Sequence, residues 1–419
     1  MGCAGSKGGS PVADESAAMM RARRGPRASV VSSQYKVETV KDTGAAEAQR
    51  LVASTGSLPL DLPVAGLHLR YAFLSQRGYY PDSPDKANQD AVRAAEGLGG
   101  NAETHFFGVF DGHGEFGTEC AQFVKDKVPA VLASEPTLAS DPDKALHSAL
   151  VAVNAQLHAS PIDDSLSGTT ACCAVLQGRT LYIANVGDSR AVVAERPADG
   201  SKPVASEGSD GAGSSGSGSA TELVARDLSQ DQTPFRLDEC HRVLQAGARV
   251  LTLDQLEGLK DPGLPCWTNE ADCDGDPPRL WSPNGMFPGT AFTRSIGDSA
   301  AEDIGVIPDP EVSATQLGPQ HAFVVLATDG VWEFISSQKA VEIIAKHNNP
   351  YDAARALVSQ AYKLWLQRET RTDDISAVVL FFDWPEAEGS NAAAAPSCAA
   401  AAAAASAPQQ QVDGMTAAA

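Results

Sequence analysis

The segment FFGVFDGHGE, residues 106–115, begins as an apolar run and ends in an acid and a histidine set between glycines. An uncharged run such as residues 106–110, bounded by turn residues, is typical of a strand that is buried on both faces. Asp111, Gly112 and His113 follow directly, at the point where such a strand reaches the edge of its sheet. We therefore expect a carboxylate and an imidazole at one edge of a buried sheet.

Two further segments join an apolar run to aspartates. In HAFVVLATDGVW, residues 321–332, the run ends at Asp329 and Gly330, and in RTDDISAVVLFF, residues 371–382, Asp373 and Asp374 precede the run. A strand that lies antiparallel to its neighbour presents its first residues beside its neighbour's last residues. The acids of these segments are therefore expected to meet at one edge.

Two more acids are expected near that edge. Asp188 lies at the tight turn of ANVGDSRAVV, residues 184–193, and Asp90 lies in KANQDAV, residues 86–92. A single Asp-Gly pair usually marks only a turn, because both residues favour turn geometry. Several acids at the ends of apolar runs, without Cys or His at ligand spacing, instead favour a site for Mg²⁺ or Mn²⁺.

Composition limits the class of protein. The chain has 419 residues, 43% of them hydrophobic, and a formal net charge of −21. This content allows a substantial core, and the negative charge argues against a nucleic-acid partner, which requires a basic surface. The eight cysteines form no CxxC pair, so we expect reduced thiols. No apolar run is long enough to span a bilayer and no signal peptide follows Met1, so we expect a protein that is neither secreted nor membrane-spanning.

The chain is expected to hold one domain between two low-complexity ends. Residues 1–66 are predicted to be a flexible segment, 67–385 the folded domain and 386–419 an Ala-rich tail. The Gly/Ser-rich stretch 200–220 separates two strand-like segments and is predicted to be a long hairpin loop. Strands are predicted at 181–186, 190–195 and 321–328, and helices near 117–133, 142–158, 337–347 and 350–368.

The order of these motifs, from about residue 68 to 384, resembles the metal-dependent protein phosphatases of type 2C, most of all their plant and algal branch. The resemblance rests on FFGVFDGHGEFG, SGTTACCAVL, LYIANVGDSRAVV, GTAFTRSIGDSAAEDIGVIPDPEV, FVVLATDGVWEFIS and RTDDISAVVLF, among others. It implies an α+β fold: a four-layer α-β-β-α sandwich of two antiparallel sheets flanked by helices. It also implies that two Mg²⁺ or Mn²⁺ ions activate water to hydrolyse phosphoserine and phosphothreonine in proteins, which opposes kinase signalling.

The resemblance assigns roles to individual residues. Asp111 would bridge the two metals, with the Gly112 carbonyl on the first and Asp329 and Asp373 on the second. Asp188 would form a weaker third metal site with Asp329, Asp90 would hold metal-bound water, and His113 would be the general acid. Of the adjacent pair Asp373 and Asp374, the first is favoured, because relatives often have Asn in place of the second.

Two positions depart from the family pattern. Gln89 stands where many relatives have Glu, which predicts a weaker first metal site, and Asp85 stands where many have a phosphate-binding Arg. The neighbouring Lys86 is the alternative cation for the substrate phosphate, or else an ordinary solvated lysine. These departures leave open a phosphatase-like regulator that binds phosphoproteins without turnover. The acids by themselves also fit a hydrolase of small phosphoesters.

The N-terminal sequence MGCAGSK predicts lipidation. Gly2 matches an N-myristoylation signal, Cys3 is a palmitoylation candidate, and Lys7 and Arg21 belong to a basic cluster nearby. One myristoyl chain binds a membrane only marginally, so a second signal is needed for stable anchoring. We therefore expect a monomer anchored peripherally at a cytoplasmic membrane face, with phosphorylated proteins as partners. An unmodified tail, in a protein of the cytosol or nucleus, is the alternative.

Overall fold

Two antiparallel sheets of seven strands each form the centre of the protein. The computed structural model describes residues 51–197, 223–267 and 276–384, and its first sheet has the strand order β1-β3-β17-β16-β9-β10, with β2 also paired to β3. These strands are β1 (Leu51–Ala53), β2 (Leu58–Leu62), β3 (Leu67–Gln76), β9 (Arg190–Glu195), β10 (Val224–Asp227), β16 (His321–Ala327) and β17 (Ile375–Asp383).

The second sheet has the order β14-β6-β5-β7-β8-β15, with β4 also paired to β5. Its strands are β4 (Asp90–Ala95), β5 (Thr104–His113), β6 (Gly168–Thr169), β7 (Ala171–Gln177), β8 (Thr180–Val186), β14 (Ile296–Gly297) and β15 (Glu311–Gln316). The short 3-10 helix η1 (Leu98–Gly100) lies between β4 and β5. Ladder bonds within both sheets join antiparallel neighbours.

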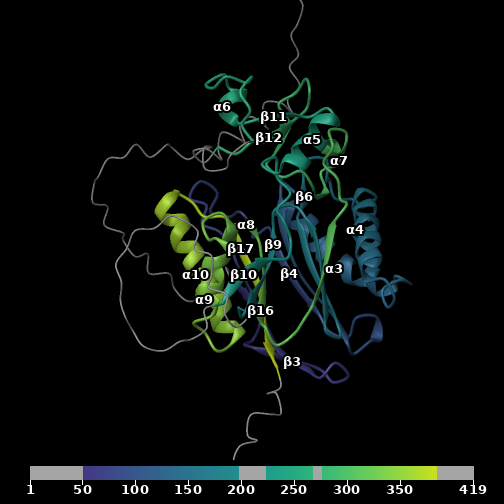
Figure 1. The fold of residues 1–419 in the computed structure, drawn as a ribbon. Coiled ribbons are helices and arrows are strands. Elements are labelled where there is room, and N and C mark those ends of the chain that lie inside the picture. The colour runs from purple at the N-terminus through teal and green to yellow at the C-terminus, as the bar shows by residue number, and fades with distance from the viewer. Residues whose placement is uncertain (1–50, 198–222, 268–275, 385–419) are drawn as a thin grey trace, which may run out of the picture. The chain divides into compact units, whose positions relative to one another are not determined.

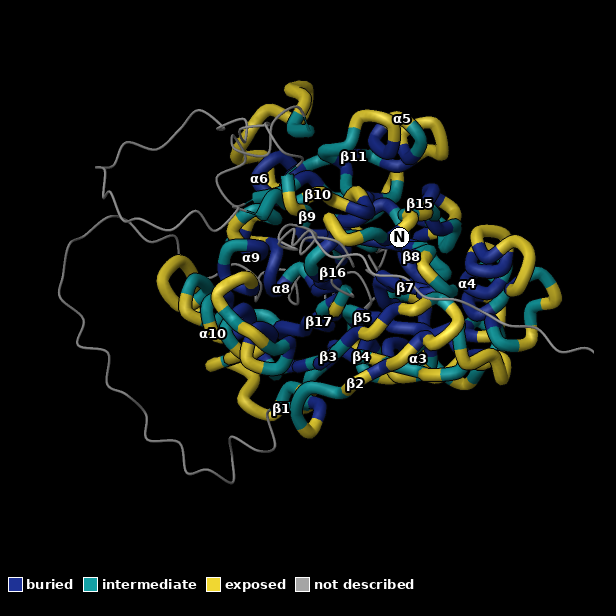
Figure 2. Tube along the Cα trace, turned by 60° about the horizontal axis from the view of Figure 1, so that its bottom comes forward, coloured by how far each residue is buried: buried dark blue, intermediate teal, exposed yellow. Residues whose placement is uncertain are grey.

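The central strands are apolar on both faces because helices cover the outer face of each sheet and the other sheet covers its inner face. Along β5, Phe106 and Phe110 pack under helices, whereas Phe107 and Val109 face the other sheet. This alternation follows from the two-residue period of a strand. The central strands in Figure 2 are accordingly dark blue. A continuous hydrophobic run therefore marks an inner strand of this fold.

Helices form the two outer layers. α3 (Gly117–Ser134) and α4 (Pro142–His158) pack on the second sheet, and α8 (Asp329–Trp332), α9 (Ser337–Ile344) and α10 (Pro350–Arg368) pack on the first. Asp141 and Asn349 cap α4 and α10 through their side chains, and each helix then begins with proline. The expected four-layer α-β-β-α sandwich is confirmed (Figure 1).

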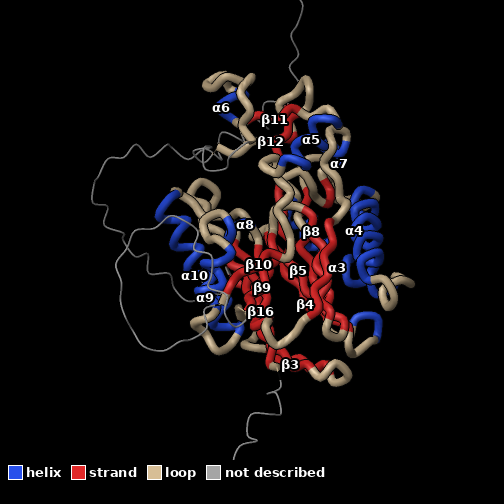
Figure 3. Tube along the Cα trace, in the orientation of Figure 1, coloured by secondary structure: helices blue, strands red, loops and turns tan. Residues whose placement is uncertain are grey.

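A smaller unit, which we call the flap, comprises the elements from α5 to β13. It contains α5 (Leu237–Gln245), β11 (Arg249–Leu251), α6 (Leu253–Leu256), β12 (Arg279–Trp281) and β13 (Pro288–Thr290), and α7 (Ser299–Glu302) follows it. Its three strands form a separate sheet, at the top of Figure 3. Cys240, Val243 and Leu280 belong to its own small core, against which Ala301 and Ile304 also pack.

One expected boundary is wrong. The folded domain begins at residue 51 within the described part, because β1 and β2 precede residue 66 and both pair with β3. The short apolar run LPLDL at 58–62 alternates too briefly to stand out in the sequence, and pairing with β3 buries Leu60 and Leu62. The strands on either side of the expected hairpin loop, β9 and β10, pair antiparallel.

Several predictions concern residues outside the described part of the chain. These are the loop 200–220, the tail 386–419 and the N-terminal residues up to 50, including Gly2 and Cys3. Within the described residues, the helices are too short or too polar to traverse a lipid bilayer.

Candidate active site

The predicted acids lie at the ends of neighbouring strands. Asp111 lies near the end of β5 and pairs in register with Asp90, the first residue of β4. In the other sheet, Asp329 follows β16 and Asp373 precedes β17, two antiparallel neighbours. Thr328 Oγ1 donates a 3.0 Å hydrogen bond to Asp90 Oδ2 and so joins the two sheets at this edge. The expected meeting of the strand ends is confirmed.

The turn that carries Asp188 is tied to the same edge. The Asp111 amide donates to Thr170 Oγ1 at 3.1 Å, and the Thr170 hydroxyl lies 2.7 Å from the hydroxyl of Ser189. Thr170 is buried between these segments. It therefore connects the strand end at Asp111 to the turn at Asp188.

The carboxylates act strongly on one another. Burial raises the pKa of Asp111, and the charges of Asp329, Asp90 and Asp373 raise it further. Burial likewise raises the pKa of Asp329, with additional repulsion from Asp188 and Asp373, and the Asp111 and Asp329 carboxyls share a hydrogen bond. Acids that raise one another's pKa in this way require positive charge to be ionised together.

Asp373 and Asp374 have different environments although they are adjacent. The buried carboxylate of Asp374 accepts backbone hydrogen bonds from Gly78 N at 2.6 Å and Gln89 N at 2.8 Å. Asp373 is half-buried and accepts a 2.8 Å hydrogen bond from the hydroxyl of Tyr80. Both carboxylate oxygens of Asp374 therefore accept hydrogen bonds from the backbone. In Asp373, the hydrogen bond from Tyr80 involves only Oδ1 and not Oδ2.

The side chains fit a hard cation such as Mg²⁺ or Mn²⁺. Asp90 Oδ1 and Asp329 Oδ1 are buried oxygens without a hydrogen-bond partner, and such atoms are uncommon unless an ion or water satisfies them. The acids at this edge offer only oxygen ligands, which these ions prefer. In residues 51–197, 223–267 and 276–384, no three acidic, His or Cys side chains are already arranged around one ion position. The hydrogen bond between Asp111 and Asp329 directs these two carboxyls toward each other.

The glycines after two of the acids are required by close packing. A Cβ at Gly112 would collide with the carbonyl oxygen of Gly117 and lie 2.6 Å from that of Gln89. A Cβ at Gly330 would collide with the carbonyl oxygen of Asp374. The Asp-Gly motif at these positions therefore permits backbone segments to approach, in addition to any role in turning the chain.

Lys86 is half-buried beside the acids, and Asp85 is exposed. The Lys86 ammonium lies 4.0 Å from the centre of the Tyr80 ring, whose hydroxyl binds Asp373. Burial and the charge of Asp373 raise the pKa of Asp374, and the charge of Lys86 partly opposes this rise. Arg77 is the arginine of this loop, and it donates to backbone carbonyls including that of Pro84 at 2.6 Å. Lys86 is thus held near the carboxylates by an aromatic ring.

His113 lies between Asp188 and Asp298, a carboxylate that does not belong to the group of acids described above. Its Nε2 is 2.6 Å from Asp298 Oδ2, and its ring packs against Phe292 with centroids 4.5 Å apart. Burial and then Asp231 raise the pKa of Asp188 to about 6, and the charge of His113 acts in the opposite direction on the same carboxyl. His113 therefore faces a site that contains Asp188.

Comparison with known proteins identifies the family of the chain. Residues 84–365 match the family model described as "Protein phosphatase 2C". The chain belongs to the protein phosphatase 2C family. It is 49% identical over 340 residues to "Probable protein phosphatase 2C 35" of Arabidopsis thaliana, covering 80% of this chain and 91% of that protein. It is 33% identical over 374 residues to "Probable protein phosphatase 2C 34" of the same plant, covering 84% and 91%.

The solved structures agree at the level of the fold. The chain superposes on the serine-threonine phosphatase 2C from Toxoplasma gondii with a TM-score of 0.60 and 21% identity, over 80% of this chain and 99% of that one. As a protein phosphatase 2C, the protein is a serine/threonine phosphatase of a metal-dependent family, and phosphoproteins are its class of substrate. The predicted family, enzyme class and fold are thus confirmed.

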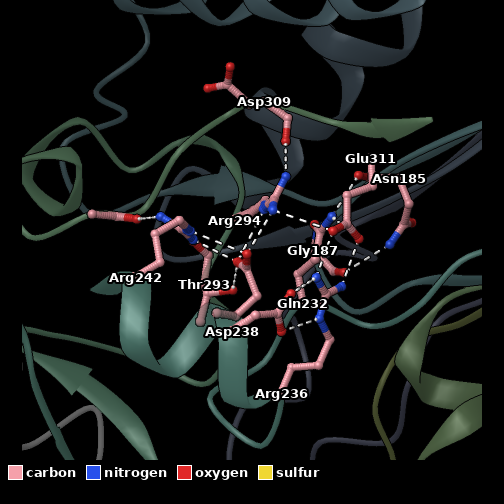
Figure 4. Close-up of polar contacts among 12 residues, drawn as sticks. Asn185, Gly187, Gln232, Arg236, Asp238, Arg242, Thr293, Arg294, Asp309 and Glu311 are labelled. Carbon is pink, nitrogen blue, oxygen red and sulfur yellow. Dashed lines mark hydrogen bonds and ion pairs between the residues drawn. The ribbon is translucent and has the colours of Figure 1, made fainter. Parts of the chain in front are cut away.

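Three polar residues of this phosphatase were not singled out by sequence reasoning. Tyr80 and Asp298 contact Asp373 and His113, respectively, and Gln232 supports the turn that carries Asp188. The buried Gln232 accepts from Gly187 N at 2.7 Å and donates to the carbonyl of Asn185 at 3.1 Å (Figure 4). No spacing rule identifies such contacts, because each joins segments far apart in the sequence.

The network around Gln232 continues into the flap. Gln232 Nε2 donates to Glu311, which pairs with Arg236 at 2.6 Å, and Arg294 lies between Glu311 and the buried Glu239 of α5 (Figure 4). A continuous set of ion pairs and hydrogen bonds therefore links the first helix of the flap to the turn that carries Asp188.

Proposed function

We propose that this phosphatase hydrolyses phosphoserine and phosphothreonine in proteins with two divalent cations, Mg²⁺ or Mn²⁺, and so opposes kinase signalling. The observation that carries the proposal is the group of half-buried aspartates from four separate segments, Asp111, Asp188, Asp329 and Asp373, which act on one another and adjoin His113. Such a group serves as a cation site with access for a substrate.

The residues divide into cation-binding and substrate-binding roles. Asp111, the Gly112 carbonyl, Asp329 and Asp373 would hold the two cations. Asp188 with Asp329 would hold a weaker third, and Asp90 would orient water. When bound, these ions neutralise phosphate oxygens and lower the pKa of a coordinated water toward about 7. Lys86, held over the Tyr80 ring, would bind the substrate phosphate as a point charge.

The first prediction is loss of activity when a cation-binding acid is neutralised. Asp111→Asn and Asp329→Asn should each lower kcat on a phosphothreonyl peptide by about a hundredfold or more, because charge stabilisation by the metals contributes several kcal/mol. Activity is measured with Mn²⁺ and again with a chelator. The exposed Asp303→Asn is the matched control.

The same assays distinguish a protein phosphatase from a non-catalytic regulator and from a hydrolase of small phosphoesters. Peptide hydrolysis at the full rate in either variant would refute the assignment of these acids. A wild-type chain that binds the phosphopeptide but never hydrolyses it would identify a non-catalytic regulator, and hydrolysis of aryl phosphate alone would identify a small-phosphoester hydrolase.

We assign the general acid to His113. A seryl or threonyl alkoxide is a poor leaving group, so it requires a proton as its bond to phosphorus breaks, whereas a nitrophenolate does not. We predict that His113→Ala lowers kcat on a phosphopeptide by about 10²-fold and has a much smaller effect on an aryl phosphate. Equal losses on the two substrates would exclude this role.

We also propose peripheral membrane association, based on the N-terminal motif. Gly2 and Cys3 would carry a myristoyl and a palmitoyl chain, two signals that together anchor a protein stably. The protein would then act as a monomer at a cytoplasmic membrane face. Fractionation of wild type, Gly2→Ala and Cys3→Ser tests this, since both variants should move to the soluble pool. The same distribution for all three would refute the anchor.

A further inference from the structure

The imidazole of His113 is bonded to a buried acid outside the carboxylate group. Nε2 of His113 lies 2.6 Å from Oδ2 of Asp298, and the Asp298 side chain is only 2% exposed. The same oxygen accepts a 2.6 Å hydrogen bond from the hydroxyl of Ser295, which is also buried. Asp298 is therefore held in place from one side by serine and from the other by histidine.

The backbone of Asp298 is in an unfavourable conformation. Its φ of 54° and ψ of 44° are left-handed, and it is the only non-glycine residue of the described part with a positive φ. Such a residue persists only where its surroundings stabilise it, and this kind of strain is concentrated at functional sites. Asp298 also occupies the N-cap position of α7, yet its side chain does not cap that helix. The carboxylate is thus directed to His113 in place of the usual local bond of an N-cap aspartate.

The space for the pair depends on Gly168 in the strand between them. His113 is opposite Gly168 in the β5–β6 ladder, and Gly297 is opposite Gly168 in the β6–β14 ladder. A Cβ at Gly168 would lie 2.5 Å from Asp298 Oδ2 and 3.0 Å from His113 Nε2. Any larger residue at this position would separate the two side chains.

The segment that carries Asp298 is fixed by neighbouring groups. The Asp298 amide donates to the Ser167 carbonyl at 2.9 Å, and the Gly297 amide donates to the buried side chain of Asn154 at 2.8 Å. The Ser299 amide donates to the carbonyl of Asp164 at 3.1 Å. Three successive residues are therefore anchored, which holds the carboxylate at one position relative to β5.

We propose that Asp298 is a positioning residue for the catalytic acid, an inference that rests on the proposed function. Its carboxylate lies 2.6 Å from Nε2 of His113 and so fixes the rotation of the ring, which leaves Nδ1 as the nitrogen that faces the substrate. During hydrolysis, a water oxygen bonds to phosphorus and the bond from phosphorus to the seryl or threonyl oxygen breaks. The electron pair of that bond takes the proton from Nδ1, and the water releases its own proton to solvent.

Two substitutions separate this role from a structural one. Asp298→Gly removes the carboxylate and favours the observed backbone conformation, since glycine adopts positive φ without strain. Asp298→Asn keeps the shape and tolerates the same conformation, but lacks the charge. Asp303→Asn, an exposed acid just after α7, is the matched control. Thermal unfolding of each variant verifies that the protein is folded.

The kinetic test compares leaving groups. Both Asp298 variants should lower kcat on a phosphothreonyl peptide by about tenfold to a hundredfold, within the range of general acid catalysis, and should change kcat on p-nitrophenyl phosphate by less than about threefold. With His113→Ala already present, Asp298→Gly should lower peptide turnover by less than about twofold, because residues that act as one unit are not additive. Equal losses on the two substrates, or additive losses in the double variant, would overturn the inference.

A second readout does not depend on turnover. This readout uses NMR spectra of ¹⁵N-histidine-labelled full-length protein with Mg²⁺. The signals of His113 are assigned as those that are absent from the spectrum of the His113→Gln variant. These signals should shift in Asp298→Gly but not in Asp303→Asn. Unchanged His113 signals in Asp298→Gly would contradict the inference. If the wild type itself does not hydrolyse the phosphopeptide with Mn²⁺, the proposed function fails instead, whatever the NMR result.

Discussion

At the scale of single residues, neighbours of the same type have different roles because their partners differ. Asp374 binds two backbone amides that hold the segments at Gly78 and Gln89 to the strand end, whereas Asp373 binds the hydroxyl of Tyr80. The hydroxyl and ring of Tyr80 thus have separate partners, Asp373 and Lys86. Substitutions at Tyr80 can test the two contacts one at a time.

Tyr80→Phe should raise the Mn²⁺ concentration needed for half-maximal activity by about tenfold or more, because groups that orient a metal ligand typically contribute this much. The KM for a phosphopeptide at saturating Mn²⁺ should not change, since the ring still holds Lys86. Tyr80→Leu should raise both quantities. The exposed Tyr79→Phe is the control, and a Tyr80→Phe variant with wild-type Mn²⁺ dependence would show that Asp373 needs no such support.

Gln89 also has a role that its residue type did not reveal. Its Nε2 donates to the Gly114 carbonyl at 2.8 Å, directly after His113. Gln89→Glu cannot donate this bond, so we predict a loss of about 1–3 kcal/mol in the free energy of unfolding, the penalty for a buried acceptor left without a partner. Chemical denaturation measures it. Equal or greater stability of the variant would show that another donor reaches Gly114.

At the scale of elements, the flap is attached to the sandwich by charged groups as well as apolar ones. Glu239 of α5 is 2% exposed and accepts hydrogen bonds from Arg294 at 2.7 Å, Arg242 at 2.6 Å and Thr293 at 2.6 Å. Burial by itself would raise the pKa of Glu239, but these bonds outweigh it and lower the pKa below the ordinary 4.5. The folded state therefore stabilises the ionised form.

Removal of this acid should destabilise the protein more than removal of its neighbour. We predict that Glu239→Gln lowers the free energy of unfolding by about 3–5 kcal/mol, because the half-buried Arg242 and Arg294 lose the buried carboxylate with which both pair. Asp238→Asn, which removes an exposed partner of Arg236, should change it by less than about 1 kcal/mol. Similar effects of the two substitutions in urea denaturation would contradict the role of the network.

The same ion pairs predict a pH dependence. Because the pKa of Glu239 is lower in the folded state, its contribution to stability is fully present above pH 4.5 and is lost as the pH falls below that value. Between pH 6 and pH 3, the wild type should therefore lose more stability than Glu239→Gln. Parallel pH curves for the two proteins, recorded by thermal unfolding, would refute this.

At the scale of the whole molecule, the two sheets bring acids together at a cost in repulsion. Asp111 belongs to one sheet and Asp329 follows a strand of the other; burial raises the pKa of both, the charge of Asp329 raises that of Asp111 further, and the charges of Asp188 and Asp373 raise that of Asp329. A cation that binds the folded state alone adds RT ln(1 + [L]/Kd), about 2.7 kcal/mol at a hundred times Kd. A cation bound by acids of both sheets would therefore stabilise the folded sandwich in addition to its proposed role in catalysis.

We predict that saturating Mg²⁺ or Mn²⁺ raises the Tm of the wild type by several degrees. Asp329→Asn should have a higher Tm than wild type without metal, because repulsion is relieved, and a smaller rise when metal is added. Scanning calorimetry with chelator and with each cation measures both effects. A full metal-dependent rise in Asp329→Asn would show that the cations bind elsewhere.

The residue pattern alone predicted a mixed α and β protein with several buried strands and acids at the ends of those strands. The runs at 106–110 and 321–328 are apolar on both faces because each lies between a sheet and a helical layer, and this pattern is readable without a structure. The same holds for Asp111 and Asp329, since an acid after a buried strand lies at the edge of the sheet. The family resemblance added the four-layer fold and the enzyme class, and both are confirmed.

Only the tertiary structure decided which side chains support those acids. Asp298 is 185 residues from His113, and Tyr80 is 293 residues from Asp373. Their contacts depend on strand register and on a missing Cβ at Gly168. The early strands at 51–53 and 58–62 were missed for a related reason, because a short edge strand is stabilised by pairing with its neighbour more than by its own pattern. Local periodicity records burial, whereas side-chain partners depend on distances that only the folded chain defines.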